Sequence, residues 1–182
     1  MTPNNYYVNI ILTKQGGASL DIFLVDTSAL LRDIDILNKL PYCKIIIHTT
    51  VLEELDNISK KNNSKGSSAR RVINKLFELK NRGNFYNGIK WTNKTVEFSD
   101  MKPNIETYLR FGLSERKNDN LLLCVAKEIK ERSEKNKVII LTADKSFALK
   151  AAGDIDVEYI KTPTKKKKHK NKGFFNNSQM AR

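Results

Sequence analysis

Four carboxylates in separate segments of the chain stand where they could hold a divalent metal. Asp26 directly follows the apolar run Ile22–Val25, and Asp144 closely follows a second such run. Glu54 flanks the apolar side of a predicted helix, and Asp119 stands at the start of another. Carboxylate oxygens are the ligands that Mg²⁺ and Mn²⁺ prefer. Two such ions about 3.5–4 Å apart can activate water for phosphodiester cleavage.

Each of these acids also fits an ordinary structural role when it is taken alone. Asp26, Asp119 and Asp144 stand where an acid commonly caps the N-terminus of a helix. Glu54 has acidic neighbours in sequence, as on a solvated helix face. The prediction of a metal site therefore rests on the four acids together, because such a cluster would repel itself unless a cation bound it.

Alternating strands and helices are expected to bring these acids together. Predicted strands cover residues 22–25, 44–47, 89–91, 137–141 and 156–160, and predicted helices cover 28–40, 50–60, 67–81, 118–135 and 144–152, with a short one near 105–111. This alternation predicts an α/β fold with a central parallel sheet of about five strands and helices on both faces. Asp26 and Asp144 should then lie at the carboxyl edge of the sheet, where open α/β sheets place ligands.

Two stretches between these elements have weaker patterns. The predicted helix over 67–81 carries Val72, Ile73, Leu76 and Phe77, which we expect to be its buried stripe. A polar loop is predicted over 61–66. Residues 92–117 are the least regular part of the chain, and no strand is predicted there.

The positive charge of the chain is concentrated at its C-terminal end. The formal net charge is +13 over 182 residues, and eight of the 33 Lys and Arg residues but no acid follow residue 160. We expect an N-terminal arm or hairpin over 1–20, one domain over 21–160, and a basic, disordered tail over 161–182. The tail favours a polyanionic partner such as nucleic acid. A solubilising tail or a nuclear localisation signal would have the same composition.

Several other classes of protein are disfavoured by the sequence. No apolar run approaches the roughly 18 residues of a membrane span, so no membrane association is expected. The N-terminus lacks a signal-peptide pattern. Cys43 and Cys124 fit no zinc spacing and suit buried thiols in a reducing compartment. We therefore expect a cytoplasmic protein, or a nuclear or nucleolar one if the source is eukaryotic. His48 is expected to be a satisfied polar residue rather than a ligand.

Short motifs around the four acids resemble those of the PIN domain family of metal-dependent nucleases. The matching pieces, in order, are Val25–Leu31, Val51–Asp56, Asn118–Leu123 with Ala126, and Leu141–Asp144. The resemblance extends over about residues 21–160. Within the family, the run Glu54-Leu55-Asp56 followed by Ser68–Arg71 is more similar to PIN domains fused to PhoH-type ATPases, or to those of RNA quality control, than to the shortest toxins.

This resemblance implies a three-layer α/β/α fold and a metal-dependent endoribonuclease. It implies that Asp26, Glu54, Asp119 and Asp144 form a catalytic pocket that holds one or two Mg²⁺ or Mn²⁺ ions. Thr27, Ser28 and Thr142 would support these carboxylates by hydrogen bonds. The substrate would be single-stranded or structured RNA. Basic side chains expected to guide the strand are Lys60, Lys61, Lys65, Arg70, Arg71, Lys165, Lys166, Lys167 and Lys168.

One departure from the family pattern keeps alternatives open. Many members carry a further acid shortly after the fourth, whereas Lys145, Ser146 and Phe147 follow Asp144 here. This difference slightly favours a PIN-fold scaffold that binds RNA or protein without cutting. A toxin of a toxin–antitoxin pair is a third hypothesis, which the basic tail and the long 92–117 segment oppose. A protein partner or a homodimer is compatible with each hypothesis.

Overall fold

Strand β1 (Ile22–Val25) lies inside a six-stranded sheet, with β2 (Lys44–His48) on one side and β5 (Val138–Thr142) on the other. The computed structural model describes residues 19–115, 117–133, 135–153 and 155–161. All four residues of β1 are buried, and every residue of β2 and β5 is buried as well. These runs can be almost entirely apolar because helices cover both faces of the sheet.

The sheet has the order β3-β4-β2-β1-β5-β6 and is parallel except at one edge. Strand β6 (Asp156–Tyr159) pairs in parallel with β5, and β4 (Lys94–Ser99) pairs in parallel with β2. Strand β3 (Ile89–Trp91) is antiparallel to β4. The predicted three-layer α/β/α architecture is confirmed, and the sheet has six strands where about five were expected.

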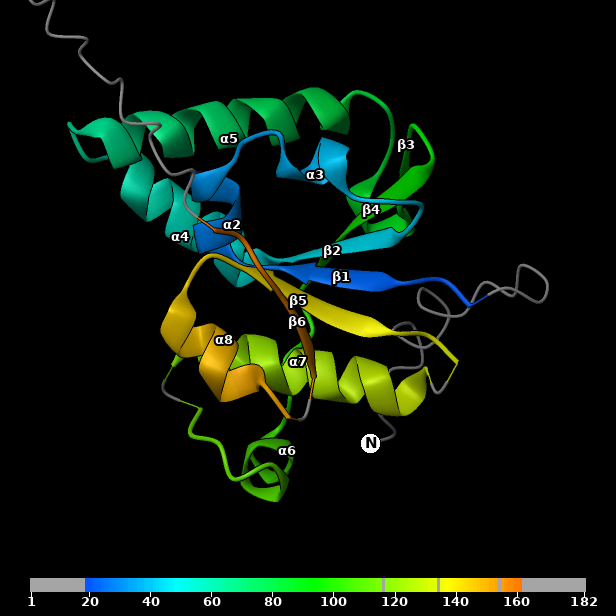
Figure 1. Ribbon diagram of the computed structural model, residues 1–182. Helices are drawn as coiled ribbons and strands as arrows, with labels where there is room; N and C mark the ends of the chain where they lie inside the picture. The colour runs from blue at the N-terminus through cyan, green and yellow to red at the C-terminus, as the bar shows by residue number, and fades with distance from the viewer. Residues whose placement is uncertain (1–18, 116, 134, 154, 162–182) are drawn as a thin grey trace, which may run out of the picture.

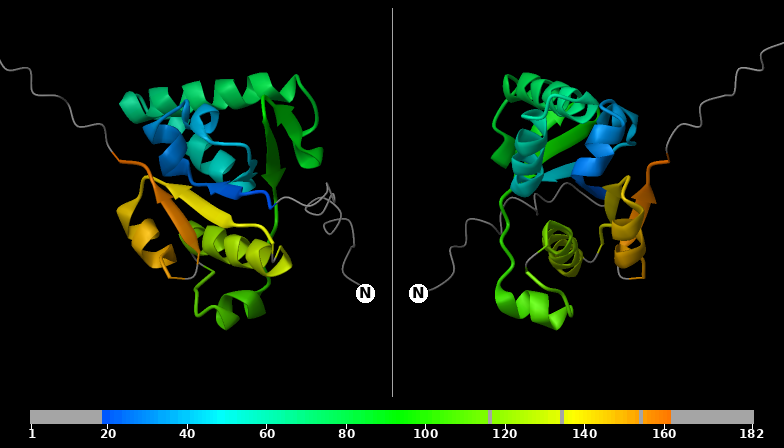
Figure 2. Two further views of the ribbon diagram at one scale, coloured as in Figure 1. Left: turned by 45° about the vertical axis from the view of Figure 1, so that its right-hand side comes forward. Right: turned by 90° about the vertical axis from the view of Figure 1, so that its left-hand side faces the viewer.

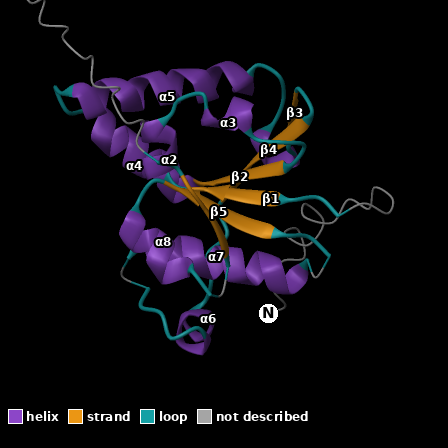
Figure 3. Cartoon of the chain, in the orientation of Figure 1, coloured by secondary structure: helices purple, strands orange, loops and turns teal. Residues whose placement is uncertain are grey.

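Two layers of helices enclose the sheet (Figures 1 and 3). One layer contains α2 (Thr27–Arg32), α3 (Ile36–Lys39), α4 (Thr49–Ser59) and α5 (Ser64–Lys80). The other contains α7 (Asn118–Arg132) and α8 (Lys145–Ala151), with α6 (Ile105–Arg110) outside α7 in every view (Figure 2). No helix in the described ranges is both long and apolar enough to cross a bilayer.

The predicted helix over 28–40 is wrong in its middle, where the chain forms α2 and α3 separated by a turn. Asp33 has extended backbone angles of φ −145° and ψ 101° at the end of α2. Its side-chain Oδ1 accepts a hydrogen bond of 3.0 Å from the backbone N–H of Asp35. A local bond of this kind offers the backbone an alternative to the helix, which explains the break despite the helical spacing of apolar residues.

Helix α5 begins inside the predicted polar loop over 61–66, because its first turn is stabilised by two local features. The side chain of Asn63 caps it by accepting a hydrogen bond of 3.0 Å from the N–H of Gly66. A Cβ on Gly66 would lie 1.9 Å from the carbonyl oxygen of Lys61, so only glycine lets α5 approach the end of α4 this closely. Residue 66 therefore determines how the α4–α5 hairpin closes.

Strand β4 was missed because its sequence, Lys-Thr-Val-Glu-Phe-Ser, carries charges that are nevertheless buried. Glu97 is ion-paired to Lys44 of the neighbouring strand at 2.8 Å, and both side chains are almost inaccessible to solvent. The ammonium of Lys94 donates to the carbonyl of Asn38 and the side chain of Asn93. Partners from distant segments therefore satisfy these charges, and single-sequence patterns do not reveal such pairings.

The predicted terminal segments are almost wholly outside the described residues. Residues 1–18 and 162–182 are among those that the structure does not describe. The predicted N-terminal arm, the basic tail and the expected RNA-binding residues Lys165–Lys168 therefore stay predictions.

Candidate active site

The carboxyl ends of β1 and β5 place two of the predicted acids beside each other. The two strands pair in parallel with Val25 opposite Leu141, and the N–H of Asp26 donates to the carbonyl of Leu141 at 2.9 Å. Asp144 lies two residues after the end of β5 and is the N-cap of α8. Strands β1 and β5 end on the left-hand side of Figure 1, where α7 and α8 also begin. We name Asp26, Glu54, Asp119 and Asp144 the acidic edge.

Asp26 is the buried centre of a hydroxyl network. Its side chain is only 7% exposed, and its Oδ2 accepts hydrogen bonds from Thr142 Oγ1 at 2.7 Å and from the hydroxyl of Ser28. The same two hydroxyls accept the backbone N–H groups of Asp144 and Ala143, at 3.0 and 2.8 Å. Ser28 and Thr142 therefore connect the β1–α2 turn to the β5–α8 turn and fix the orientation of this carboxylate.

Burial shifts the protonation of Asp26 toward the neutral acid. Desolvation raises the pKa of Asp26 above its ordinary value, and the bonds from Ser28 and Thr142 oppose that rise. Glu54 and Asp119 raise the pKa further through their negative charge. Although Asp26 occupies the N-cap position of α2, its side chain makes no capping hydrogen bond. A capping role therefore does not account for this buried carboxylate.

Glu54 reaches the edge from the second turn of α4. Its Oε2 accepts a hydrogen bond from Thr27 Oγ1 at 2.6 Å, and its Oε1 accepts one from Asn118 Nδ2 at 2.6 Å. These two bonds tie α4 to the starts of α2 and α7. Thr27 therefore contacts Glu54, whereas Ser28 and Thr142 contact Asp26.

Asp119 and Asp144 lie at the more open rim of the acidic edge. Asp119 is the second residue of α7. Desolvation is the main cause that raises its pKa, the charge of Lys150 opposes this rise, and the charges of Asp144 and Glu54 add to it. Asp144 is the N-cap of α8, and its Oδ1 accepts the N–H groups of Ser146 at 2.7 Å and Phe147 at 3.1 Å. The capping role that the sequence suggested for Asp144 therefore exists, and it occupies one of the two carboxylate oxygens.

The four acids form one electrostatic group. The charges of Glu54 and Asp119 act on Asp26, and those of Glu54 and Asp144 act on Asp119. Within the described ranges, however, no three His, Cys, Asp or Glu side chains converge closely enough to hold an ion among themselves. An ion here would take one or two carboxylates directly and complete its shell with water. Mg²⁺ is commonly bound in this way, so the donor set fits such an ion.

Three polar residues that the sequence analysis did not single out also belong to this site. Asn118 bonds to Glu54, and Asn120 donates from Nδ2 to the carbonyl of Ser114 at 2.5 Å. The ammonium of Lys150 contacts the side-chain oxygen of Asn120 and lowers the pKa of Asp119. The asparagines stand in the motif that carries Asp119 and could have been identified there. Lys150 comes from a different helix, and only the tertiary fold reveals its role.

The predicted RNA-guiding residues of the domain lie at the α4–α5 corner rather than among the acids. Lys60, Lys61, Lys65, Arg70 and Arg71 are all exposed. The Lys60 ammonium pairs with Asp56 at 2.7 Å, and the Arg70 guanidinium donates to the carbonyls of Ser59 and Lys61. Lys60 is six residues beyond Glu54 on α4, which is about 9 Å along a helix axis. This cluster would contact an RNA strand only where the RNA extends beyond the acidic edge.

Comparisons with known proteins agree with this architecture. A family model described as a PIN domain matches residues 23–160. Eleven chains of solved structures match, among them a domain of a functionally unknown protein from Methanocaldococcus jannaschii DSM 2661. That domain is 22% identical, has a TM-score of 0.51, and the match covers 80% of this chain and 94% of the other. At this identity the likeness supports the fold alone. No curated protein matches the chain.

Proposed function

The chain belongs to the PIN domain family, and from this premise we propose that it is a metal-dependent endoribonuclease. Its fold is of the nuclease type. The observation that carries the proposal is the acidic edge, in which four carboxylates from four separate segments act on one another electrostatically. A protein gains nothing in stability by gathering like charges, so such a group is best explained by a cation that binds it.

We assign the ion to Asp26 and Asp144, with Asp119 sharing it through a water of its shell. Both hydroxyl bonds to Asp26 meet Oδ2, and both capping bonds to Asp144 meet Oδ1. No donor among the described residues bonds to the second oxygen of either carboxylate, which leaves these oxygens for an ion. A bound Mg²⁺ or Mn²⁺ would supply a polarised water and neutralise charge on the leaving oxygen.

The other residues of the site would position the reactants. Glu54 has both oxygens bonded, so its proposed role is to hold the geometry between α2, α4 and α7 and to orient the attacking water. In the reaction, water adds to phosphorus, the bond from phosphorus to the leaving oxygen breaks, and that oxygen takes up a proton. The Lys150 ammonium lies beside Asp119 and would balance the negative charge of the incoming phosphate.

RNA is the proposed substrate, in the cytoplasm or, in a eukaryote, in the nucleus or nucleolus. Exposed cations at the α4–α5 corner and in the basic tail after residue 160 would bind phosphates of the RNA at some distance from the bond that is cleaved. Phosphate contacts of this kind give affinity without sequence preference, and the affinity falls as salt rises. The corner cations are Lys60, Lys61, Lys65, Arg70 and Arg71, and the tail cations include Lys165, Lys166, Lys167 and Lys168.

A scaffold that binds RNA without cutting it is the second candidate. Two observations favour it. Lys145, Ser146 and Phe147 stand where a further acid is common, and no three His, Cys, Asp or Glu side chains of the described residues converge to hold an ion. Such a protein would bind RNA equally well with Mg²⁺ or EDTA. It would leave the RNA intact under every metal condition.

The test is cleavage of a labelled single-stranded RNA by the full chain with Mn²⁺, Mg²⁺ or EDTA, beside Asp26→Asn. We expect cleavage with metal and none with EDTA. The cleavage rate should fall roughly 1000-fold in the variant, because metal coordination lowers the activation barrier by several kcal/mol. Glu53→Gln is the matched control, because Glu53 is an exposed acid on α4 outside the acidic edge. Binding without cleavage under every metal condition would establish the scaffold. Cleavage that survives Asp26→Asn unchanged would refute the assigned site.

A further inference from the structure

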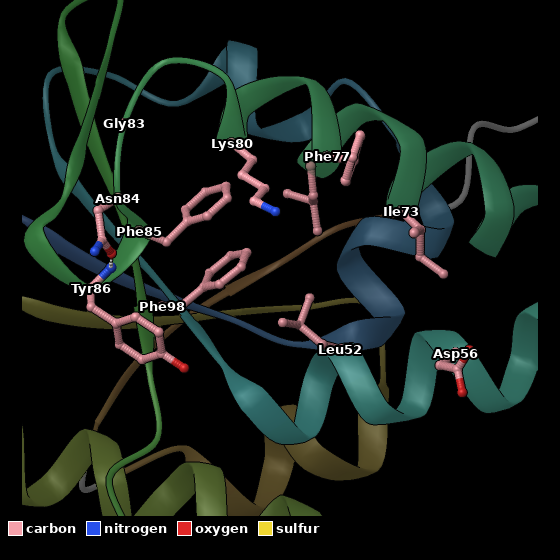
Figure 4. Close-up of a pocket in the computed structure, with 11 residues that line it drawn as sticks. Leu52, Asp56, Ile73, Phe77, Lys80, Gly83, Asn84, Phe85, Tyr86 and Phe98 are labelled. Atoms are coloured by element: carbon pink, nitrogen blue, oxygen red, sulfur yellow. Dashed lines mark hydrogen bonds between the residues drawn. The ribbon is translucent and has the colours of Figure 1, made fainter.

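A large apolar groove lies on the side of α4 that faces away from the acidic edge. It has a volume of about 710 Å³ and lies between α4, α5, the short 3₁₀ helix η2 (Phe85–Asn87) and β4. Figure 4 shows Leu52 of α4 on one side of it, with Ile73 and Phe77 of α5 along another. We name this feature the α4–α5 groove.

Aromatic side chains dominate one end of the groove. Phe85 and Phe98 stack face to face with ring centres 3.8 Å apart and planes 5° apart. Tyr86 is 48% exposed and Phe77 is 62% exposed. An isolated exposed aromatic residue is ordinary, but several around one apolar hollow are typical of a binding surface.

The exposure of Phe77 corrects the expected stripe of α5. That stripe was predicted to be buried as a whole, and the structure buries Val72 and Leu76 but leaves Ile73 half-buried and Phe77 exposed. The apolar surface of α5 is therefore wider than its own domain covers. The uncovered half faces the α4–α5 groove, where a partner would bury it.

A single cation points into this apolar surface. Figure 4 shows the Lys80 side chain directed into the groove, and its ammonium lies 5.6 Å from the centre of the Phe77 ring. No carboxylate of the described residues forms an ion pair with Lys80. Asp56, which lines the opposite end, is already paired with Lys60. An occupant with one carboxylate opposite Lys80 would match this arrangement.

We propose that the α4–α5 groove binds an acidic amphipathic helix of a partner protein. Two helices and a strand frame the groove, and a helical segment fills such a hollow with apolar side chains at i, i+4 and i+7. A carboxylate on the same segment meets Lys80. The formal charge of +13 favours an acidic partner and opposes pairing with a second copy of this chain. RNA fits poorly, because the lining offers a single cation and little hydrogen-bonding capacity.

This binding site is separate from the acidic edge and does not depend on the proposed nuclease activity. Leu52 and Asp56 are four residues apart and line the groove, whereas Glu54 lies between them in sequence. At 3.6 residues per turn, Glu54 is rotated about 200° from each of them around α4. A helix in the groove and an ion at the acidic edge would therefore occupy opposite sides of α4.

The test uses two display libraries of 16-residue helix-forming peptides with fixed Leu or Phe at i, i+4 and i+7. One library carries Glu and Asp at the remaining positions and the other carries Lys and Arg. We expect the full chain to enrich peptides from the acidic library only. Phe77→Ser should lower the affinity for those peptides at least tenfold, as expected for the loss of a central aromatic anchor. Lys80→Glu should also weaken the binding of the acidic peptides, because it puts a like charge opposite their carboxylate. Leu149→Ser is the matched control, since Leu149 is 79% exposed on α8 outside the groove.

Other occupants would give different results in the same experiment. No enrichment from either library, or binding that neither Phe77→Ser nor Lys80→Glu changes, would overturn the proposal. Self-association in sedimentation that Phe77→Ser abolishes would assign the groove to a second copy instead. Competition between single-stranded RNA and a selected peptide, lost in Lys80→Glu, would assign it to nucleic acid.

Discussion

Helix α4 separates two regions that break the usual rules of protein surfaces in opposite ways. On one side, the acidic edge buries Asp26, with Glu54 and Asp119 near it and Asp144 near Asp119. On the other, the α4–α5 groove leaves Phe77 and Tyr86 exposed to water. The first region carries charge that the fold alone does not need, and the second carries apolar surface that the fold does not cover. We propose that an ion compensates the first departure and that a helix of a partner protein covers the second.

The interactions that hold the two regions in place also differ, with hydrogen bonds at the acidic edge and packing around the groove. Asp26 and Glu54 are held by hydroxyl and amide groups from α2, α7 and β5, so their geometry is fixed before any ion arrives. The groove is framed by packing, with the Phe85–Phe98 stack at one end and the Gly66 contact closing the α4–α5 hairpin. Preorganised polar groups suit catalysis, whereas an apolar hollow suits association.

After the loss expected for Asp26→Asn, the next largest effect separates two adjacent residues of α4. Glu54→Gln should lower metal-dependent RNA cleavage by roughly 100-fold, because residues that orient a metal site commonly contribute 10- to 100-fold. Glu53→Gln, which changes the neighbouring exposed acid, should leave the rate unchanged. Single-turnover cleavage rates of the two variants provide the comparison. Equal losses would mean that α4 contributes general negative charge rather than a positioned carboxylate.

The second prediction concerns the residue that caps α4. His48 Nδ1 accepts the N–H of Thr50 at 3.2 Å, and Nε2 lies 2.8 Å from the carbonyl of Met101. A carbonyl only accepts and a backbone N–H only donates, so these contacts require the neutral ring with its proton on Nε2. His48→Ala should lower the free energy of unfolding by about 1 kcal/mol, as for other lost N-caps.

The same histidine makes stability depend on pH. Burial lowers the pKa of His48 below its ordinary value of 6.5, against the raising effects of the Met101 bond, Asp100 and Glu53; Lys102 lowers it further. A depressed folded pKa means that this contribution to stability is present above pH 6.5 and is lost as pH falls through the folded value. Urea unfolding of wild type and His48→Asn between pH 5 and 7.5 should show a steeper acid loss for wild type. Parallel curves would exclude His48 as the cause.

The sequence predicted the acidic edge better than the groove, because the edge depends on local sequence patterns and the groove depends on contacts between distant segments. Asp26 and Asp144 closely follow predicted buried strands, so strand pattern and sheet topology placed them at one edge. The supporting roles of Ser28 and Thr142 came from the resemblance to the PIN domain family. Asp119 and Glu54 followed from helical spacing. The groove could not be predicted, because β4, which forms part of its lining, pairs with β2 beside the buried Lys44–Glu97 contact between distant segments. The exposure of Phe77 likewise depends on what covers α5, which its helical period does not specify.

A third prediction tests whether the acidic edge destabilises the fold when no ion is bound. Burial raises the pKa of Asp26, so its favourable contribution is present below the ordinary value of 3.8 and is lost as pH rises through the folded value. Ionisation of the buried side chain therefore opposes folding. Asp26→Asn should stabilise the metal-free protein by about 1 kcal/mol at pH 7 in EDTA, as other removals of functional strain do. The gain should shrink as pH falls, because the neutral acid is the form that burial favours.

Adding metal should reverse that difference. An ion that binds the folded state stabilises it in proportion to its affinity, so Mn²⁺ should stabilise the wild type and have little effect on Asp26→Asn. Asp56→Asn should respond to Mn²⁺ as the wild type does. Thermal unfolding with Mn²⁺ or EDTA measures both effects without any RNA. A wild type that gains nothing from Mn²⁺ would contradict the assignment of an ion to this edge.

The smallest effect is expected on the other side of α4. Phe77→Ser removes an exposed aromatic ring that the fold does not bury, so stability should change by no more than about 0.5 kcal/mol. RNA cleavage should be unchanged, because Glu54 and its bonds to Thr27 and Asn118 lie on the opposite side of the helix. A large loss of stability would show that Phe77 packs in the folded domain after all. A loss of cleavage at unchanged stability would show that α4 transmits strain from the groove to Glu54, and a helix bound in the groove would then regulate the acidic edge.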